Sequence, residues 1–533
     1  MKHRGICLVI IILFFSNVSQ QTSQTTATII PKSNITNIEI TSDTFVTKWD
    51  TSKSGVSASN QISLPLESTG KYNFIVDWGD NSTNTITTWN QAETNHTYAS
   101  VGVYDILING NLSGWSFGNS GDKLKIIELS QWGNMSLGNS GSYFSGASNM
   151  VLTATDAPDL SGTTNLERAF KDCSLLGSTG NMNLWNVSSV TKIWGIFQGA
   201  TSFNQPIGNW NTLRITDMSF MFKGATSFNQ SIENLNMSSV HSMYWMFQDA
   251  TSFNQPIGNW DVSSVQDMTA MFQDATSFNQ PIGNWDVSSV QDMTAMFQDA
   301  TSFNQPIDNW DVSSVLNMND MFKDTSLSQN NYDDLLANWG QLSLRPKVYF
   351  HAGNSTPTNF YAKRYIIENF NWHITDGYSV DTTNPIINSP ADMTIEEGDR
   401  NTVLQWEVGD KSPSSYSISI NDVEVIFLPW QNGTISYSLS DLEIGRFTIT
   451  ITLYDLAVNR ASDTVIVSVT SRDSTSSDSD VISSDTKLTV SDRSLEASDI
   501  LPVSITHGYV YTAMIFIISR IILLNYRSKS RLD

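Results

Sequence analysis

The middle of the 533-residue chain repeats itself every 25 residues. Residues 246–270 and 271–295 are identical, and each reads MFQDATSFNQPIGNWDVSSVQDMTA. The same interval separates a series of phenylalanines, namely Phe197, Phe222, Phe247, Phe272, Phe297 and Phe322. A fixed period of this size is typical of a solenoid, in which each unit buries its apolar side only against its neighbours.

Each repeat places apolar side chains at fixed positions, such as Phe272, Ile282 and Trp285, and fills the intervals with turn-forming Gly, Asn, Pro, Asp and Ser. No interval is long enough for a stable amphipathic helix. We therefore expect stacked coils that form a mainly β, leucine-rich-repeat-like solenoid over residues 122–325. If adjacent coils pair as parallel strands, each adds roughly 4.8 Å of length. A different C-terminal cap, partly helical, is expected over 326–378, because an open end would expose the core.

Short alternating strands with turn clusters between them flank the array over residues 61–121 and 381–470, and in the second range they predict a β-sandwich domain. Residues 21–60 are rich in Thr and Ser and are expected to form a polar N-terminal segment. Residues 471–508 are rich in Ser and Asp and are expected to form a solvated stalk without a core.

Both ends carry patterns typical of membrane targeting. Lys2 and Arg4 precede the apolar run Ile6–Phe15, which predicts a secretory signal peptide over residues 1–20. Residues 509–526 are nearly all apolar and predict a transmembrane helix, and the basic tail 527–533 is expected to be cytoplasmic. An amphipathic or cleaved tail is the alternative, because Arg520 interrupts the apolar run.

The identical repeats carry the motif FNQPIGNWDVSSV, followed after two residues by Met and then, after two more residues, by Met-Phe. This motif resembles the BspA-like leucine-rich-repeat surface proteins, also described as 26-residue surface-protein repeats. Upstream, Trp78-Gly79-Asp80 and His96-Thr97-Tyr98 resemble a PKD-type sandwich, and residues 381–470 resemble an Ig-like module without its cysteine pair. The resemblance implies a secreted or surface-anchored protein involved in adhesion or cell contact, and it supplies no ligand. Leu235 departs from the pattern where neighbouring repeats carry Trp.

Two sets of asparagines are candidate sites. One recurs with the repeat and is expected to form a structural ladder of stacked amides: Asn204, Asn229, Asn254, Asn279 and Asn304. The other lies in N-x-Ser/Thr contexts and gives candidate glycosylation sites, although chance also produces such contexts in this composition: Asn34, Asn81, Asn95, Asn111, Asn134, Asn186, Asn229, Asn236, Asn354 and Asn432.

Two aspartate columns also follow the repeat and are expected to form a solvated acidic face rather than calcium sites: Asp217, Asp267 and Asp292, with Asp249, Asp274 and Asp299.

Catalytic patterns are missing from the sequence. The six histidines are scattered, and no HExxH, GxSxG or glycine-rich phosphate loop occurs. Cys173 occupies a column in which other repeats carry Ala, so a packing role is expected. We therefore predict no enzyme activity, no catalytic residue, no cofactor and no metal.

Asp and Glu outnumber Lys and Arg by 52 to 29, and the resulting charge of −23 disfavours nucleic acid as a partner. The sequence favours a single-pass cell-surface protein whose N-terminal region lies outside. Its expected function is adhesion or binding of an extracellular protein or glycan through a multivalent solenoid face. The alternative is a structural spacer or surface-coat component without a specific ligand.

Overall fold

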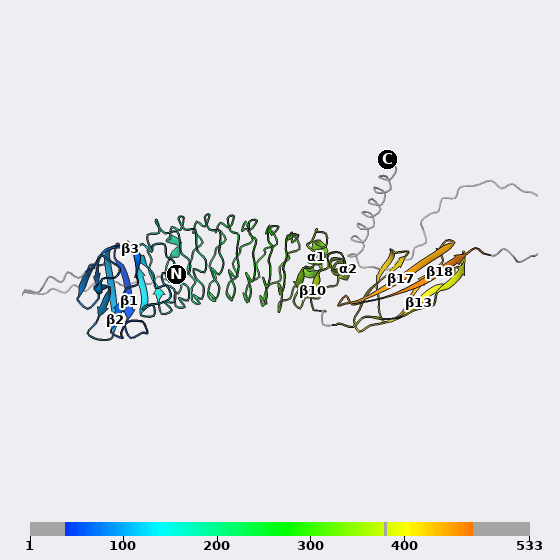
Figure 1. Ribbon diagram of the computed structural model, residues 1–533, viewed down its shortest axis with the longest axis horizontal. Coiled ribbons are helices and arrows are strands. Elements are labelled where there is room, and N and C mark those ends of the chain that lie inside the picture. The colour runs from blue at the N-terminus through cyan, green and yellow to red at the C-terminus, as the bar shows by residue number, and fades with distance from the viewer. Residues whose placement is uncertain (1–37, 378–380, 473–533) are drawn as a thin grey trace, which may run out of the picture. The chain divides into compact units, whose positions relative to one another are not determined.

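The computed structural model describes residues 38–377 and 381–472 (Figure 1). The expected signal peptide, transmembrane helix, cytoplasmic tail and nearly all of the stalk lie outside these residues. Within them, no helix has both the length and the apolar character needed to cross a bilayer. The prediction of a mainly β chain built around a solenoid is confirmed.

A six-stranded sheet precedes the repeats, in the order β4-β3-β6-β1-β7-β8. Its strands are β1 (Phe45–Asp50), β3 (Leu66–Asp77), β4 (Thr83–Ile86), β6 (Val103–Trp115), β7 (Ile126–Gln131) and β8 (Val151–Leu152). A small second sheet pairs β2 (Gln61–Ser63) with β5 (Asn95–Thr97), after the 3-10 turn η1 (Ala92–Thr94).

Strand β1 corrects the expected boundary of the polar N-terminal segment. It lies within residues 21–60, yet it pairs antiparallel with β6 and buries Phe45 and Trp49. Its partner residues follow about 60 positions later in the chain, as in the pair Thr47 and Ile106. The segment is short and half polar, so only this long-range pairing identifies it as a central strand.

The first sheet continues into the array without a break in packing. β7 pairs antiparallel with β1 on one side and parallel with β8 on the other, so β7 is shared by the sandwich and the first coils. One hydrophobic core extends from Phe45 to Trp372. The boundary expected at residues 121 and 122 therefore does not separate two cores.

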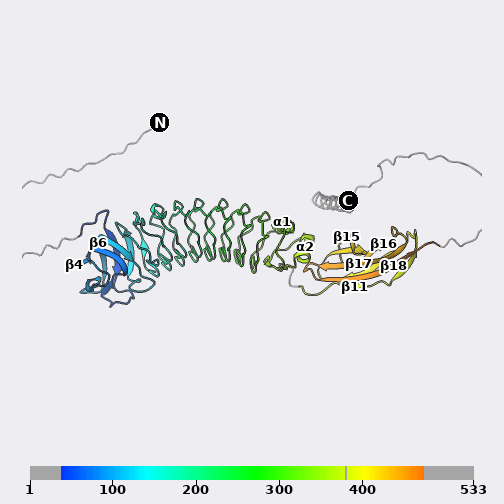
Figure 2. The same ribbon diagram turned by 45° about the horizontal axis from the view of Figure 1, so that its top comes forward.

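The coils stack through tight turns, and not through the extended parallel strands that the sequence left as one possibility (Figures 1 and 2). Successive coils share single parallel bridges, as between Asp267 and Asp292. Alternate backbone amides reach the next coil, as from Phe247 N to Met271 O at 2.9 Å, while the amides between them close local turns. One 3-10 turn, η2 (Met182–Leu184), lies among the early coils.

Left-handed residues explain why extended strands do not form. Two positions in each coil have a positive φ, and one of them carries Gly or Asp, as at Gly224 (φ 70°), Asp249 (φ 58°) and Asp274 (φ 58°). Gly and Asp adopt this conformation more readily than most residues. The left-handed backbone therefore explains why Asp recurs at positions Asp249, Asp274 and Asp299.

Aromatic rings stack along the interior of the array. Phe272 lies between Phe247, at 5.5 Å between ring centroids, and Phe297, at 5.7 Å. Trp260 and Trp285 stack similarly at 6.4 Å, and Trp285 Nε1 donates to the carbonyl oxygen of Ile257 at 3.0 Å. These ladders bury the repeated apolar columns and satisfy the indole donor.

The array ends in α1 (Gln329–Trp339), β9 (Tyr349–His351), α2 (Phe360–Phe370) and β10 (His373–Thr375), and β9 pairs parallel with β10. Phe350 of β9 forms a bridge to Met318 of the last coil. A buried ion pair joins Lys363 Nζ to Asp376 Oδ2 at 2.8 Å. The cap thus closes the core with helices, as expected for a terminal unit.

The C-terminal domain is a sandwich with a core of its own, which includes Trp406, Ile418 and Val465. One sheet has the order β11-β13-β16, and the other has the order β12-β18-β17-β14-β15. The strands are β11 (Ile386–Asn388), β12 (Met393–Glu396), β13 (Val403–Gly409), β14 (Pro413–Ile420), β15 (Val423–Pro429), β16 (Gly433–Ser438), β17 (Gly445–Asp455) and β18 (Arg460–Thr470).

Candidate functional site

The asparagine column forms a hydrogen-bonded ladder along the array. The side-chain oxygen of Asn254 accepts the backbone N–H of Asn279 at 3.0 Å, and the same contact recurs from coil to coil. Gln280 Nε2 adds a second bond to the Asn254 side chain at 2.9 Å. At the array's end, Asn304 accepts from Ser328 N at 2.7 Å. These asparagines hold coils together through their side-chain oxygens.

The aspartate columns have local structural roles. Asp267 Oδ1 accepts the backbone N–H of Thr269 at 2.9 Å, which closes a short turn, and Asp217 and Asp292 do the same in their coils. Burial raises the pKa of Asp274, and its neighbours Asp249 and Asp299 raise it further. Among the described residues, neither column brings three carboxylates within ligating distance of one another.

Every described asparagine in an N-x-Ser/Thr context is exposed, and Asn34 lies outside the described residues. Exposure is the condition that a glycan would require. Asn229 belongs to both sets, because its side-chain oxygen also accepts from Asn254 N.

The residues that resemble a PKD motif meet in the first sandwich. His96 Nε2 lies 2.8 Å from Asp80 Oδ2, and the imidazole stacks on Trp78 at 4.7 Å between centroids. Tyr98 donates its hydroxyl to the carbonyl oxygen of Trp78 at 3.0 Å. Asp77 accepts from Gly79 N at 3.0 Å. The two acids therefore shape a turn and its packing.

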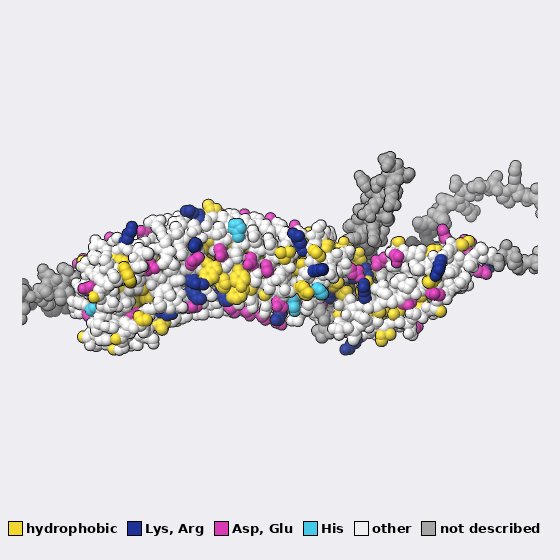
Figure 3. Space-filling model, in the orientation of Figure 1, with side chains coloured by type: hydrophobic (Ala, Val, Ile, Leu, Met, Phe, Trp, Pro, Cys, Tyr) yellow, Lys and Arg dark blue, Asp and Glu magenta, His cyan; other side chains and the backbone are white. Residues whose placement is uncertain are grey.

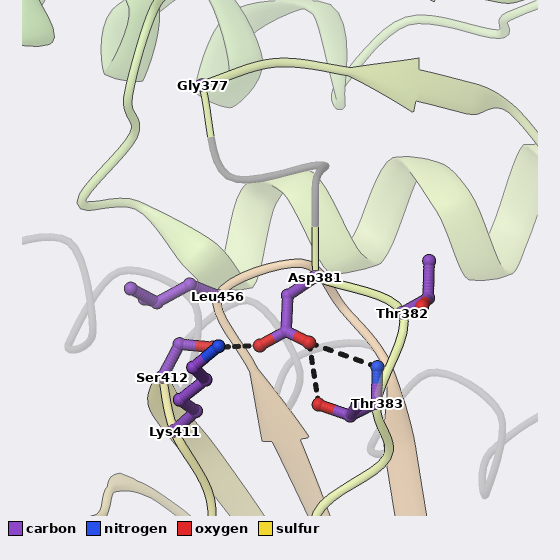
Figure 4. A pocket seen from close by; sticks show the side chains of 7 residues that line it. All are labelled: Gly377, Asp381, Thr382, Thr383, Lys411, Ser412 and Leu456. Carbon is purple, nitrogen blue, oxygen red and sulfur yellow. Dashed lines mark hydrogen bonds between the residues drawn. The ribbon is translucent and has the colours of Figure 1, made fainter.

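A cluster of three carboxylates, which was not predicted from the sequence, lies at the start of the C-terminal sandwich. Oxygens of Asp381, Asp410 and Asp455 lie within 4.8 Å of one another. Figure 4 shows Asp381 held by Thr383 and Ser412, with Ser412 Oγ donating to Asp381 Oδ2 at 2.8 Å. The hydrogen bonds from Thr383 lower the pKa of Asp381 to about 2, whereas burial raises that of Asp455. Turn hydrogen bonds account for this group.

A different surface departs from the repeat, and we call it the aromatic patch. It consists of the rings of Trp194, Phe220, Tyr244 and Trp245 with the cations of Arg168 and Lys223. All four rings are half-buried. Figure 3 shows hydrophobic side chains gathered near the middle of the array, with Lys and Arg beside them.

The rings of the aromatic patch contact one another across successive coils. Phe220 lies at its centre, 4.9 Å from Trp194, 5.2 Å from Tyr244 and 5.3 Å from Trp245 between ring centroids. The three interplanar angles lie between 63° and 66°, whereas Tyr244 and Trp245 stack at 13°. The surface of the patch is therefore uneven and presents ring edges as well as ring faces.

Cations cover both indoles. The guanidinium carbon of Arg168 lies 4.1 Å from the Trp194 ring centroid, and Lys223 Nζ lies 3.4 Å from that of Trp245. Burial lowers the pKa of Lys223, against the opposing effect of Asp249, and Lys171 lowers it further. None of the ion pairs found within residues 38–377 and 381–472 includes Arg168 or Lys223.

The backbone under the patch is strained. Arg168, Phe220 and Trp245 have φ values of 52°, 59° and 56°. The corresponding position is Gly195 in one coil and Ala270 in another. A bulky L-residue in this region costs about 1–2 kcal/mol, and such outliers concentrate at functional sites.

This patch is not predicted from the sequence, because its residues are not ones that recur in the repeat. The signal was present in the pairs Ser219-Phe220 and Tyr244-Trp245, which stand where the identical repeats carry Thr269-Ala270. Two neighbouring coils that exchange small residues for large aromatic ones indicate a local use of the surface.

Cys173, by contrast, is buried, and burial raises the pKa of its thiol well above the ordinary range. The side chain donates to the carbonyl oxygen of Phe144 at 3.0 Å. It is a packing residue that remains protonated at neutral pH.

Comparisons with known proteins concern mainly the array. Residues 138–255 and 230–339 match the family described as "Mycoplasma protein of unknown function, DUF285". No curated protein matches the chain. A crystal structure of InlP from Listeria monocytogenes aligns at 12% identity over 66% of this chain and 89% of that one, with a TM-score of 0.14. That score supports no argument about a shared fold or function. The chain is similar to the DUF285 family over its repeats, and the C-terminal sandwich lies outside the matched residues.

Proposed function

We propose that this chain is a cell-surface repeat protein, without enzyme activity, that binds an extracellular protein or glycan through the side of its array. A C-terminal membrane anchor, an N-terminal region outside the cell, and adhesion as the outcome belong to the same proposal. The aromatic patch is the observation that carries it.

The physical reason concerns the stability of the left-handed backbone at the patch. Folding with Phe220 and Trp245 in left-handed backbone is less favourable than folding with Gly, which stands at the corresponding position as Gly195. Neither residue is needed for stacking, because the coils that carry Ala270 and Ala295 stack through the same backbone contacts. A stability cost without a structural return is typical of residues kept for binding.

The patch also has the composition of a binding surface. Trp, Tyr and Arg are enriched at interface positions that dominate binding energy. The patch combines these types on adjacent coils, with Phe220 at its centre. This local arrangement favours one principal site over equal contributions from every repeat.

The alternative of a spacer is supported by the coils beyond the patch. The identical repeats place only Ala270 and Ala295 at the position that holds Trp245. These coils extend the array and present no comparable cluster there. A spacer function for that part is compatible with binding at the patch.

The test is binding of the purified full-length chain to intact cells of several types, measured for the unaltered chain and for Phe220→Ala combined with Trp245→Ala. We expect saturable binding that the double variant loses. Circular dichroism and thermal unfolding must show that the variant remains folded. Protease shaving of intact producing cells tests the location, and an array protected from protease would contradict it. Absence of saturable binding by the unaltered chain would favour the spacer.

A further inference from the structure

The charges and relief of the aromatic patch identify the chemistry of its partner. This inference rests on the proposed function, since it concerns the same surface. We propose that the patch binds an acidic protein segment, in which Asp or Glu side chains pair with Arg168 and Lys223 while neighbouring apolar side chains pack against the rings.

Charge is the first argument. The chain has a net charge of −23, so its overall field repels acidic molecules. At the patch, Arg168 and Lys223 lie on indole rings and take part in none of the ion pairs found among the described residues. Lys171 lies close enough to Lys223 to lower its pKa. Asp249 is the opposing carboxylate, and its separation from Lys223 exceeds ion-pair distance.

A carboxylate from a partner would complete this arrangement. Cations that are already partly desolvated against rings lose less hydration when they form an ion pair. Hydrogen bonds between such cations and a carboxylate are about twice as strong as neutral ones. A basic partner would face repulsion from the same groups.

The shape of the patch favours a protein over a glycan. A sugar stacks on a free, flat ring face, but Arg168 covers the Trp194 indole and Lys223 covers that of Trp245. The rings around Phe220 are tilted by 63° to 66°, which leaves edges and gaps between them. Such relief matches side chains of varied shape and not the flat face of a pyranose.

The experiment pans a display library of random linear peptides against the full-length chain and, in parallel, probes the chain with an array of neutral, sialylated and sulfated glycans. We expect selected peptides enriched in Asp and Glu with apolar neighbours. Their affinity should fall about ten-fold or more in Trp245→Ala, as for an interface residue of this type. Raising NaCl from about 0.1 M to about 1 M should also weaken binding, because the screening length falls from about 10 Å to about 3 Å.

A matched pair of charge variants isolates the cation. Lys223 and Lys323 occupy the same column of the repeat, but only Lys223 lies on an aromatic ring. Lys223→Gln introduces the residue found at the equivalent Gln248 and should weaken peptide binding several-fold, whereas Lys323→Gln should leave it within about two-fold. Trp245→Ala recreates the Ala of the identical repeats, so a folded protein is expected.

Three outcomes would overturn the inference: selected peptides without acidic enrichment, peptide binding indifferent to Trp245→Ala, or glycan binding that depends on Trp245 in place of peptide binding. If cells bind the unaltered chain and the Phe220→Ala, Trp245→Ala double variant loses that binding, but no acidic peptide is selected, the partner inference fails while the proposed function stands. If the unaltered chain binds neither cells nor peptides, both fail.

Discussion

The stacked interior of the array makes a quantitative prediction for Phe272→Ala. Phe272 is completely buried, and its ring contacts four others: Phe247 at 5.5 Å, Phe278 at 4.0 Å, Phe297 at 5.7 Å and Trp285 at 6.4 Å. Removal of a buried Phe side chain costs about 3–5 kcal/mol. Each aromatic pair contributes roughly 0.5–1.5 kcal/mol beyond burial. The free energy of unfolding should therefore fall by about 4 kcal/mol or more.

Urea unfolding followed by tryptophan fluorescence measures the loss, and hydrogen exchange locates it. Thr276→Ala, an exposed position in the same coil, is the matched control and should change stability by less than about 0.5 kcal/mol. Amide protection should fall most in the coils on either side of Phe272, because repeat units contact only their neighbours. A loss below about 1 kcal/mol for Phe272→Ala would refute the continuous aromatic core.

Three further predictions concern buried or titrating groups. Lys125→Ala should lower the free energy of unfolding by about 3–5 kcal/mol in thermal or urea unfolding, because Lys125 and Asp122 form a fully buried pair and Asp122 would be left without its counter-charge. The Asp381 carboxyl should titrate at about pH 2 by NMR. Because its pKa is lowered, the ionised carboxylate contributes stability above about pH 4, and that stability is lost as pH falls through 2. A midpoint near 4 would contradict its hydrogen bonds to Thr383. Cys173 should resist alkylation in the folded protein and react once denaturant is added, and rapid labelling of the native chain would contradict its burial.

The repeat made the array predictable. A fixed 25-residue spacing identifies which columns are buried, and residues such as Phe272 and Trp285 lie in the core as that spacing requires. The cap helix at Gln329–Trp339 was visible from the break in the period. Spacing alone does not report backbone conformation. The left-handed φ of Asp274 and Ala270 explains why the coils contain turns instead of extended strands.

The features that could not be predicted from the sequence depend on contacts between residues far apart in the chain. Strand β1 is defined by partners in β6 and β7, and its own six residues carry little pattern. The aromatic patch requires knowing that Trp194, Phe220 and Trp245 face the same way on adjacent coils, and they are spaced by 26 and 25 residues. Such a cluster is difficult to predict from degenerate repeats, because its residues are not the ones that recur from coil to coil.

The most direct test of a local binding surface compares two changes in one cell-binding assay. Deletion of residues 271–295 removes one of the identical repeats, restores the same Ala-Met junction and leaves every residue of the aromatic patch in place. We expect this deletion to leave the affinity unchanged and Trp245→Ala to reduce it by about ten-fold or more. A stepwise loss on deletion, with Trp245→Ala without effect, would contradict the patch and favour a multivalent face spread over all repeats.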